Sequence, residues 1–457
     1  MKTALRFLAG LLCLLCLSGC GLSSLMNPPP KEEGGKVLNI FCWNQEFKSR
    51  LERFYPGYNR ATHMIGDVKV NWVIVPNTSS IYQMMLDEAL ADQDNVPADD
   101  KVDIFLVEAD FAKQYVQVPG KAISLQALGL TEQELSEQFP YTRMVAMDAD
   151  GIQRGISWQA CPGAMVYRRD IARKVFGTDD PRAVQQAVSS WGQFDAAAAR
   201  MAAAGFRMVA GFEDTFRVFM NNMQGPWVNE RGEIVMDPAV KRWVEQTRRY
   251  TELRYNHRCK LWDKEWSRSV RGDVFCYFGP AWLIDYSLAP FSLEQEEKDG
   301  GLRERGNGTF GEWAVCRGPQ SYFWGGTWIC AAEGTDNPEL VADIMRVMCC
   351  DPMNAKAMAH GVNEFVNNRS AMRELAENEH FGVPFLGGQN YYRTLYDSAE
   401  QISMQNTTPY DWAIVEALQS TYRRYYRGEI SEAEAHTQFI ESVREVYPEL
   451  HAVPAAE

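Results

Sequence analysis

The sequence predicts an α/β fold with an open, mostly parallel sheet and helices on both of its faces. Between residues 37 and 107, three short apolar strands alternate with two amphipathic helices, which is the rhythm of such a sheet. Farther along, segments with apolar residues at helical spacing alternate with short, strand-like apolar runs that Gly and Pro turns bound. The chain of 457 residues, 46% of them hydrophobic, is long enough for two or three domains.

The first three strands are expected at residues 37–42, 68–75 and 102–107. A helix over residues 46–55 carries apolar side chains on one face, and a second helix follows the turn at residues 76–77. Ligands of open α/β sheets lie outside the carboxyl ends of the strands. We therefore expect a ligand near the polar and aromatic residues that follow the three strands, at 43–46, 76–79 and 108–110.

The rest of the chain is expected to add further strands and several helices. Strands are expected over residues 152–158, 163–168, 274–278, 312–316 and 326–331. Helices are expected near 183–189, 194–204 and 213–224, from Asp237 and Asn337 onward, and over 410–426 and 431–443. Pro238 suits the first turn of a helix capped by Asp237, and Ser431 with Glu434 forms a capping box. A charged, Gly-rich loop is expected over 291–309.

The first twenty residues are typical of a lipoprotein signal. Two basic residues precede an apolar run over residues 7–17, and small residues lead into Cys20. Cleavage before Cys20 would make it the first, lipid-carrying residue of the mature protein. We therefore expect a signal over residues 1–19 and a flexible tether over 20–36, which is rich in Pro, Gly and charge. The alternative is an ordinary signal peptide that is cleaved elsewhere.

The chain is acidic, with a formal net charge of -14 at pH 7. Removal of Lys2 and Arg6 with the signal leaves 44 basic residues against 60 acidic ones, a balance of -16. Affinity for nucleic acid comes from Lys and Arg, so nucleic acid is not an expected partner. An acidic surface is also repelled by anionic lipid, so the membrane is expected to hold the protein through its N-terminal lipid.

Eight of the eleven cysteines lie beyond residue 20. They are few for a chain of this length, so we do not expect a disulfide scaffold. Cys42, Cys276, Cys316 and Cys330 lie in apolar, strand-like runs and are expected to be buried free thiols. No CxxC pair follows Cys20, and the six histidines show no ligand spacing, so no metal site and no cofactor are expected.

Motifs of catalysis and nucleotide binding are missing from the sequence or out of context. The one GxGxxG, Gly306–Gly311, precedes a strand where a dinucleotide site needs it to join a strand to a helix. GxSxG, HExxH and Walker-type loops do not occur. Acidic residues are plentiful, but no local motif marks the carboxylate pair of a glycoside hydrolase. We therefore expect no enzyme activity, with a lipid-anchored glycan hydrolase as a less favoured alternative.

Aromatic residues make up 12% of the chain, and several Trp fall at strand ends or in Gly and Pro turns. A sugar ring has apolar C–H faces, which stack on Trp, and a polar rim, which bonds carboxylates and amides. Polar neighbours are present at Asn44, Glu46, Asp110, Gln159 and Asp285. Taken singly, each aromatic residue is as typical of a core position as of a binding site, and each acidic residue is as typical of a helix cap. The Trp residues are Trp43, Trp158, Trp227, Trp282, Trp324 and Trp328.

Four segments occur along the chain in an order that is typical of one family. They are 38–43 (LNIFCW), 162–170 (PGAMVYRRD), 278–282 (FGPAW) and 325–329 (GGTWI). By their order, from about Val37 to Val443, the chain resembles the family 1 extracellular solute-binding proteins, which are the carbohydrate receptors of ABC importers. The resemblance implies a type II, periplasmic-binding-protein-like fold of two α/β lobes. Each lobe would have a mostly parallel sheet flanked by helices, with the ligand cleft between them.

By this resemblance, lobe one is expected over residues 37–155 plus 318–372, and lobe two over 156–317 plus 373–448. Trp282 matches the family's ring-stacking Trp after a Gly-Pro turn, while the insert at 291–309 and the Trp324–Gly325 turn depart from the family's general features. Residues 43–46 and 108–110 match cleft loops of lobe one. The predicted ligand-binding residues are Trp43, Asn44, Glu46, Asp110, Trp158, Gln159, Trp282, Asp285, Trp324, Tyr410 and Trp412.

The resemblance implies a monomeric, lipid-anchored receptor on the extracytoplasmic face of the cell membrane. It would capture a mono- or oligosaccharide and pass it to the permease subunits of an ABC importer. A ligand that bridges both lobes favours the closed form through its contacts with each lobe. The alternative within the same fold is a receptor for a polyamine, a peptide or another small solute. A cationic solute would use the acidic balance and an aromatic cage.

Overall fold

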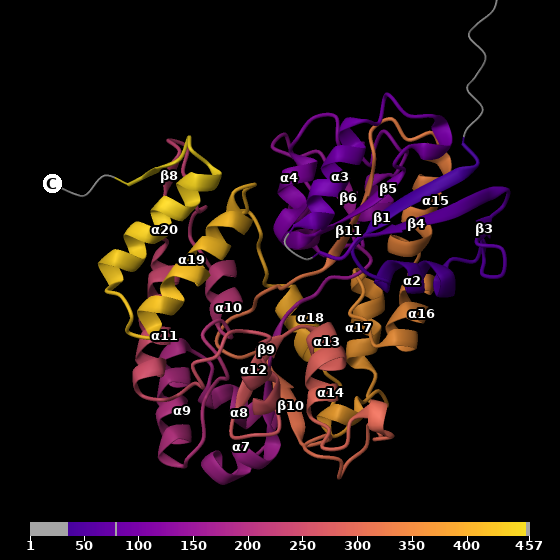
Figure 1. The fold of residues 1–457 in the computed structure, drawn as a ribbon. Helices are drawn as coiled ribbons and strands as arrows, with labels where there is room; N and C mark the ends of the chain where they lie inside the picture. The colour runs from indigo at the N-terminus through magenta and orange to yellow at the C-terminus, as the bar shows by residue number, and fades with distance from the viewer. Residues whose placement is uncertain (1–34, 78–79, 454–457) are drawn as a thin grey trace, which may run out of the picture.

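The computed structural model describes residues 35–77 and 80–453, and it has two lobes (Figure 1). We name lobe one the part built on a seven-stranded sheet and lobe two the part built on a three-stranded sheet. The expected signal, the expected lipidation site Cys20 and the expected tether up to residue 34 lie outside the described residues. The lobe boundaries expected from the resemblance stay a proposal. One of them, between residues 372 and 373, would fall inside helix α17 (Arg369–Glu377).

The sheet of lobe one has the strand order β2-β3-β4-β1-β5-β11-β6. Its centre is parallel, as the sequence predicts, because β1 pairs in parallel with both β4 and β5. The sheet is nevertheless mixed, since β11 runs antiparallel to β5 and to β6. The strands are β1 (Val37–Cys42), β2 (Tyr58–Asn59), β3 (Met64–Ile65), β4 (Val68–Ile74), β5 (Ile104–Glu108), β6 (Gly155–Ile156) and β11 (Thr327–Ala331).

The sheet of lobe two corrects the expectation of a mostly parallel sheet in each lobe. Its central strand β7 (Ala164–Arg168) pairs antiparallel with both β9 (Cys276–Gly279) and β10 (Trp313–Cys316). Over a hundred residues, mainly helical, separate β7 from β9, so the connection leaves the direction of the returning strand undetermined. Outside both sheets, β8 (Glu233–Ile234) pairs in parallel with β12 (His451–Ala452).

Helices flank both sheets; in Figure 1, α3 and α4 lie on one side of the lobe-one sheet and α15 on the other. The first ones are α2 (Glu46–Phe54), α3 (Ile81–Ala91), α4 (Ala112–Val116), α5 (Glu132–Leu135), α6 (Pro140–Val145), α7 (Arg169–Phe176), α8 (Pro181–Ala187), α9 (Trp191–Ala203), α10 (Phe216–Asn221) and α11 (Pro238–Glu252). They are followed by α12 (Lys264–Ser269), α13 (Ala281–Leu283), α14 (Ala289–Phe291), α15 (Pro338–Cys349), α16 (Pro352–Val362), α17, α18 (Tyr392–Ala399), α19 (Asp411–Tyr426) and α20 (Glu432–Val446).

The predicted helix starts are confirmed where a capping side chain marks them. The Asp237 carboxylate accepts a hydrogen bond from the Ala239 amide at the start of α11, and Ser431 and Glu434 form the capping box of α20. The sequence did not predict α16, α17 and α18, which are short and follow one another closely. Three short helical elements complete this description: η2 (Ala109–Phe111), the π-helix η3 (Ile284–Leu288) and η4 (Glu297–Asp299).

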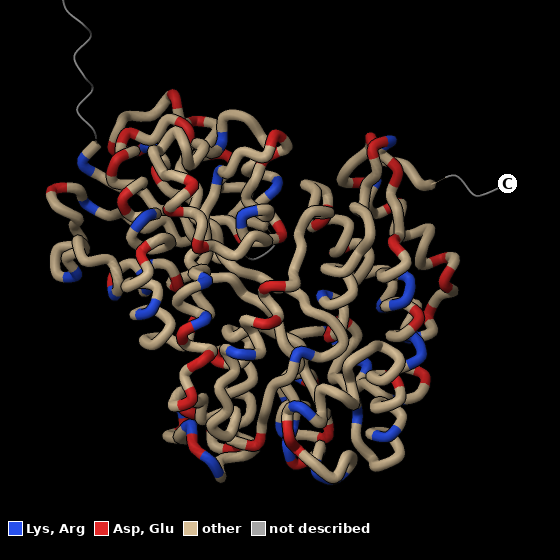
Figure 2. Tube along the Cα trace, turned by 180° about the vertical axis from the view of Figure 1, so that it is seen from behind, with Lys and Arg blue, Asp and Glu red and all other residues tan. Residues whose placement is uncertain are grey.

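Two hydrophobic cores hold the molecule together. One gathers the strands of the seven-stranded sheet with α2, α15, α18 and one face of the three-stranded sheet, and the other gathers the opposite face of that sheet with α9, α11, α19 and α20. All eight cysteines beyond residue 34 are free thiols, and seven of them are buried, which confirms the expectation for Cys42, Cys276, Cys316 and Cys330. Residues of both charge signs are spread over both lobes in Figure 2. No helix within residues 35–77 and 80–453 is long and apolar enough to cross a membrane.

Candidate ligand-binding site

A cavity of about 600 Å³ lies between the two lobes. One side comes from the end of β1 and the start of α2 in lobe one. The other comes from the loop before α12 and from α13 and η3, and the crossover from β10 to β11 completes it. The lining residues are Trp43, Asn44, Gln45, Glu46, Ser49, Arg50, Glu108, Gln159, Trp262, Trp282, Tyr286, Trp324, Gly325, Gly326 and Thr327.

Three indole rings form the wall opposite lobe one. The ring centroids of Trp282 and Trp324 lie 5.0 Å apart, and Trp262 lies 6.4 Å from the first and 6.0 Å from the second. The Trp282 indole N–H donates a hydrogen bond of 3.3 Å to the Trp324 carbonyl, which fixes the orientation of the Trp282 ring. These rings present apolar faces to the cavity that could stack on a flat ligand.

Unusual backbone geometry places these aromatic residues. Trp262 has a φ of +70°, which is rare for a bulky residue and is typical of functional sites. Gly325 has a φ of +72°, and a Cβ there would lie 3.3 Å from the indole nitrogen of Trp282. After α13, which contains Trp282, the chain forms the π-helix η3, an element that is frequent at functional sites and that carries Tyr286. The wall therefore depends on backbone conformations that the surrounding fold must hold.

The wall from lobe one combines one aromatic ring with polar groups. Trp43 packs edge-on against Tyr82 of α3, with ring centroids 5.5 Å apart. The Asn44 side-chain oxygen accepts a hydrogen bond of 2.9 Å from the Glu46 amide, so it holds the first turn of α2. This places the polar end of α2 and the ring of Trp43 on the same side of the cavity.

A network around the buried Arg50 closes one end of the cavity. The Arg50 guanidinium donates to the Glu364 carboxylate at 2.9 Å and to the Tyr286 hydroxyl at 3.1 Å, and lies 3.7 Å from Glu46. Gln159 donates to Glu46 at 3.3 Å. Burial raises the pKa of Glu46 to about 7, and the nearby Glu364 adds to this rise while Arg50 and Gln159 oppose it. Arg50 also joins the lobes here, because Tyr286 comes from η3.

A second polar network lies beside the cavity at the end of β5. Burial raises the pKa of Glu108 to about 8; Asp110 adds to the rise and Arg217 opposes it. The Glu108 carboxylate accepts a hydrogen bond from the Asp110 amide. Arg217 of α10 donates to both oxygens of Asp110, at 2.7 and 2.5 Å, which is a bidentate ion pair between the lobes.

The cavity brings together six of the eleven predicted ligand-binding residues: Trp43, Asn44, Glu46, Gln159, Trp282 and Trp324. Asp110 and Asp285 lie outside its lining. Asp110 holds Arg217, and burial raises the pKa of Asp285 to about 7, against the opposing effect of Arg303. Tyr410 and Trp412 also lie elsewhere, with their rings packed on Tyr447 and Phe111 at centroid distances of 4.9 and 5.1 Å.

The structure corrects the placement of Trp158. Its side chain is 1% exposed and stacks on Phe47 of α2, with centroids 5.2 Å apart, so it belongs to the core of lobe one. The neighbouring backbone explains this orientation, because the Asn367 amide donates to the Trp158 carbonyl and holds the segment against another part of the chain. The next residue, Gln159, then lines the cavity instead.

Sequence reasoning missed Trp262, Tyr286 and Arg50 as lining residues. Trp262 is 48% exposed and Tyr286 is 59% exposed, so both are large aromatic residues that the core does not cover. A signal was present for Trp262, which lies among Lys260, Asp263 and Lys264, where a buried ring is not expected. Within residues 35–77 and 80–453, no three His, Cys, Asp or Glu side chains are grouped to hold a metal ion.

Comparison with known families supports the two-lobe architecture. The model of a family described as bacterial extracellular solute-binding protein matches residues 58–380. No curated relative matches the chain at the sequence level.

Solved structures share the fold. An extracellular solute-binding protein of family 1 aligns with a TM-score of 0.74 at 18% identity, covering 90% of this chain and 99% of that one. The sugar-binding protein MalE from Xanthomonas citri aligns at 0.65 and 13% identity, covering 90% and 97%. The galacto-N-biose/lacto-N-biose I-binding protein of Bifidobacterium longum, in complex with lacto-N-biose, aligns at 0.63 and 14% identity, covering 92% and 100%. These alignments establish the type II periplasmic-binding-protein-like fold.

Proposed function

The chain belongs to the bacterial extracellular solute-binding proteins, and from this we propose that it captures a carbohydrate between its lobes for an ABC importer. The family and the fold are those of binding proteins. In this proposal the protein is a monomer, anchored by a lipid on Cys20, that works outside the cytoplasmic membrane and hands its ligand to permease subunits. It would use no cofactor and leave the sugar chemically unchanged.

The observation that supports a carbohydrate is the combination of three indole faces with carboxyl and amide groups around one cavity. A pyranose ring would stack on Trp282 or Trp324 while its hydroxyls bond Asn44, Glu46 and Gln159. Burial raises the pKa of Glu46 to about 7, so near neutral pH both its protonated and its ionised forms are present. It could therefore both donate hydrogen bonds to hydroxyl groups and accept them. The sugar complexes among the structural relatives agree with this assignment.

Residues from both lobes line the cavity, so a ligand there would stabilise the closed form. Trp43 and Glu46 come from lobe one, and Trp262 and Trp282 belong to segments of lobe two. Because the ligand gains contacts with both sides only when they approach, it shifts the population toward closure. A permease could then distinguish loaded from empty receptor.

Titration calorimetry against a panel of mono- and oligosaccharides tests this proposal. We expect at least one saccharide to bind with a heat signal, and the same saccharide to be found by mass spectrometry in the protein purified from its natural host. If no saccharide binds, whatever its length, the carbohydrate assignment is wrong.

A small cationic solute is the second candidate, and the carboxyl groups of the cavity favour it. Glu46 and Glu108 line the cavity beside four Trp rings, and Arg50 is already paired with Glu364. A polyamine would find an aromatic cage there and two carboxyl groups whose ionised form its positive charge would favour. In a thermal-shift screen, stabilisation by amines alone, with no response to sugars, would select this candidate.

The proposed anchor has a separate test. Replacement of Cys20 by Ala removes the only thiol at which the predicted signal could attach lipid. We expect the native protein in the membrane fraction and Cys20→Ala in the soluble fraction or uncleaved. An unchanged fractionation and mass would contradict lipid attachment at Cys20.

A further inference from the structure

A second cavity adjoins the candidate binding site on the other side of Trp262 and Trp324. Its volume is about 270 Å³, and both indole rings line it as well as the first cavity. The remaining walls come from α10, from α19 and from the loop before α12. The two rings, whose centroids lie 6.0 Å apart, therefore stand between two compartments of one cleft.

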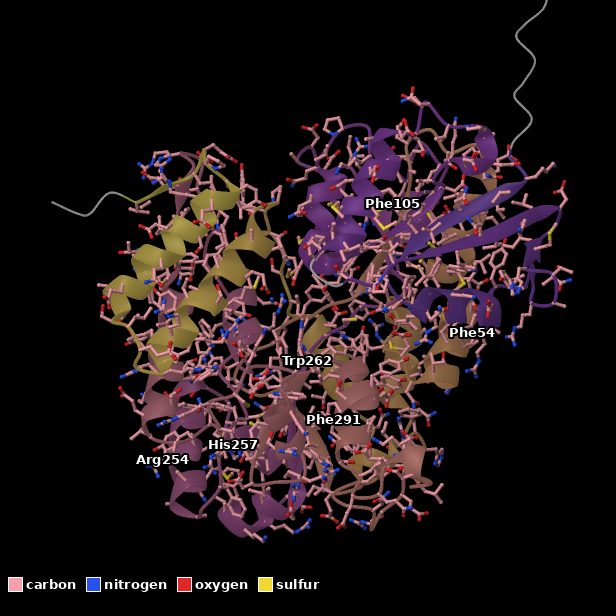
Figure 3. All side chains as sticks on the ribbon, in the orientation of Figure 1. Phe54, Phe105, Arg254, His257, Trp262 and Phe291 are labelled. Atoms are coloured by element: carbon pink, nitrogen blue, oxygen red, sulfur yellow. The ribbon has the colours of Figure 1, made fainter. Side chains whose placement is uncertain are left out.

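Trp262 is the projecting part of this partition. In Figure 3 its side chain lies at the centre of the molecule, below the sheet of lobe one. It is 48% exposed although it packs on Trp266, with ring centroids 5.0 Å apart. Its φ of +70° is uncommon for a bulky residue, and such conformations cluster at binding sites.

The second cavity is chemically equipped for another sugar ring. Phe216 and Phe278 give it apolar walls, and Lys260, Glu416 and Gln419 give it polar groups. In the part of the chain that the structure describes, none of these three polar side chains makes a hydrogen bond or an ion pair, although the charge of Glu416 helps to raise the pKa of Arg217. In contrast, Arg217 in the same cavity is held by Asp110. The three groups are thus available to hydroxyls of a ligand.

We propose that this second cavity receives a further sugar ring of an oligosaccharide whose first ring occupies the cavity lined by Trp282. This rests on the proposed carbohydrate function and narrows it to saccharides of at least two rings. The ligand passes beside Trp262, so that ring contacts both sugar units. The hydroxyls of the second unit bond Lys260, Glu416 and Gln419.

The test measures affinity by calorimetry for a monosaccharide and for the corresponding di- and trisaccharide. We expect the longer ligands to bind native protein at least about tenfold more tightly, because they fill both cavities. In Lys260→Ala combined with Glu416→Gln, affinity for the longer ligands falls on the order of tenfold while monosaccharide affinity stays unchanged. Both residues are exposed, so the variant is expected to fold. Lys264→Ala is the control, an exposed lysine of α12 that lines neither cavity.

The outcomes separate this inference from the proposed function. Equal affinity for one and for several rings, or equal losses for both in the double variant, overturns the second sugar site and leaves carbohydrate capture intact. If saccharides of every length fail to bind native protein, the proposed function itself is wrong, and the second site falls with it.

Discussion

At the scale of single residues, Trp282 carries the clearest prediction. Its ring lines the cavity, and its N–H donates a hydrogen bond to the Trp324 carbonyl. The face of the ring therefore stays available to the ligand. Trp282→Ala should weaken sugar binding by ~1–3 kcal/mol, the scale of burying one aromatic side chain. Calorimetry measures this change. Trp282→Phe keeps a ring and should retain most of the affinity; equal losses in both variants would contradict a stacking role.

The raised pKa of Glu46 makes the free energy of unfolding depend on pH. Burial raises its pKa in the folded protein to about 7, from an ordinary value of 4.5, so the folded state holds a proton that the unfolded state loses. Between about pH 4.5 and 7, this group therefore lowers the free energy of unfolding as pH rises. Glu46→Gln removes this contribution, and its melting temperature should fall less than that of native protein between pH 5 and pH 8.

The control for this prediction is Glu445→Gln, at an exposed position of α20 away from the cavity. Its pH profile should follow the native one. Parallel profiles for native protein and Glu46→Gln would mean that Glu46 does not retain its proton on folding. The same profiles measured with saturating ligand would show whether the ligand prefers the protonated carboxyl group.

At the scale of elements, the crossover between β10 and β11 links backbone conformation to the site. Gly325→Ala forces a side chain into a φ of +72° and places its Cβ 3.3 Å from the indole nitrogen of Trp282. We expect a loss of stability of about 1 kcal/mol from the backbone term and weaker ligand binding from the displaced ring. Chemical denaturation and calorimetry measure the two effects separately.

Gly177→Ala is a matched control, because Gly177 ends α7 with a φ of +80° and, among the described residues other than its own chain neighbours, none has a heavy atom within 4 Å of the added Cβ. It should lose similar stability without losing ligand affinity. If both variants bind ligand as the native protein does, the close approach of Gly325 to Trp282 has no role in the site.

Elements with strong local signals were predictable, and those defined by distant contacts were not. The helices α11 and α20 begin at capping residues that the sequence displays. The direction of β9 and β10 beside β7 carries no such local signal, because long insertions connect these strands. The short helices α16 to α18 likewise lack the long apolar periodicity that makes a helix recognisable.

At the scale of the whole molecule, ion pairs between the lobes decide how readily they separate. Asp110 and Arg217 form a bidentate pair whose side chains are 22% and 20% exposed. A double-mutant cycle with Asp110→Ala and Arg217→Ala should give a coupling of about 1–3 kcal/mol in the free energy of unfolding. The exposed pair Glu296 and Lys298 is the control, with coupling near zero.

The ion pair of Asp110 with Arg217 links the lobes, so its strength affects how readily they move relative to each other. If the coupling of Asp110 with Arg217 is as small as that of the control pair, the contact does not hold the lobes together. Small-angle scattering with and without ligand then adds a direct readout, since a ligand that bridges the lobes should make the molecule more compact.

The alternation of strands and helices in lobe one, the capped helix starts and the aromatic residues at strand ends could all be predicted from the sequence. These features depend on side-chain periodicity and on local hydrogen bonds, which neighbouring residues are sufficient to set. The two-lobe fold was predicted from a family resemblance, which rests on the order of several segments along the chain, and the solved structures confirm it.

Which aromatic residues face a common cavity depends on how the whole chain folds. Trp158 and Trp262 both lie near strand or helix ends, yet the first packs on Phe47 in a core and the second projects between the lobes. The direction of a side chain depends on the backbone dihedrals and on partners far away in the sequence, such as Asn367 beside Trp158. For the same reason, the pairing of Arg50 with Glu364 and of Asp110 with Arg217 became visible only once the lobes were assembled.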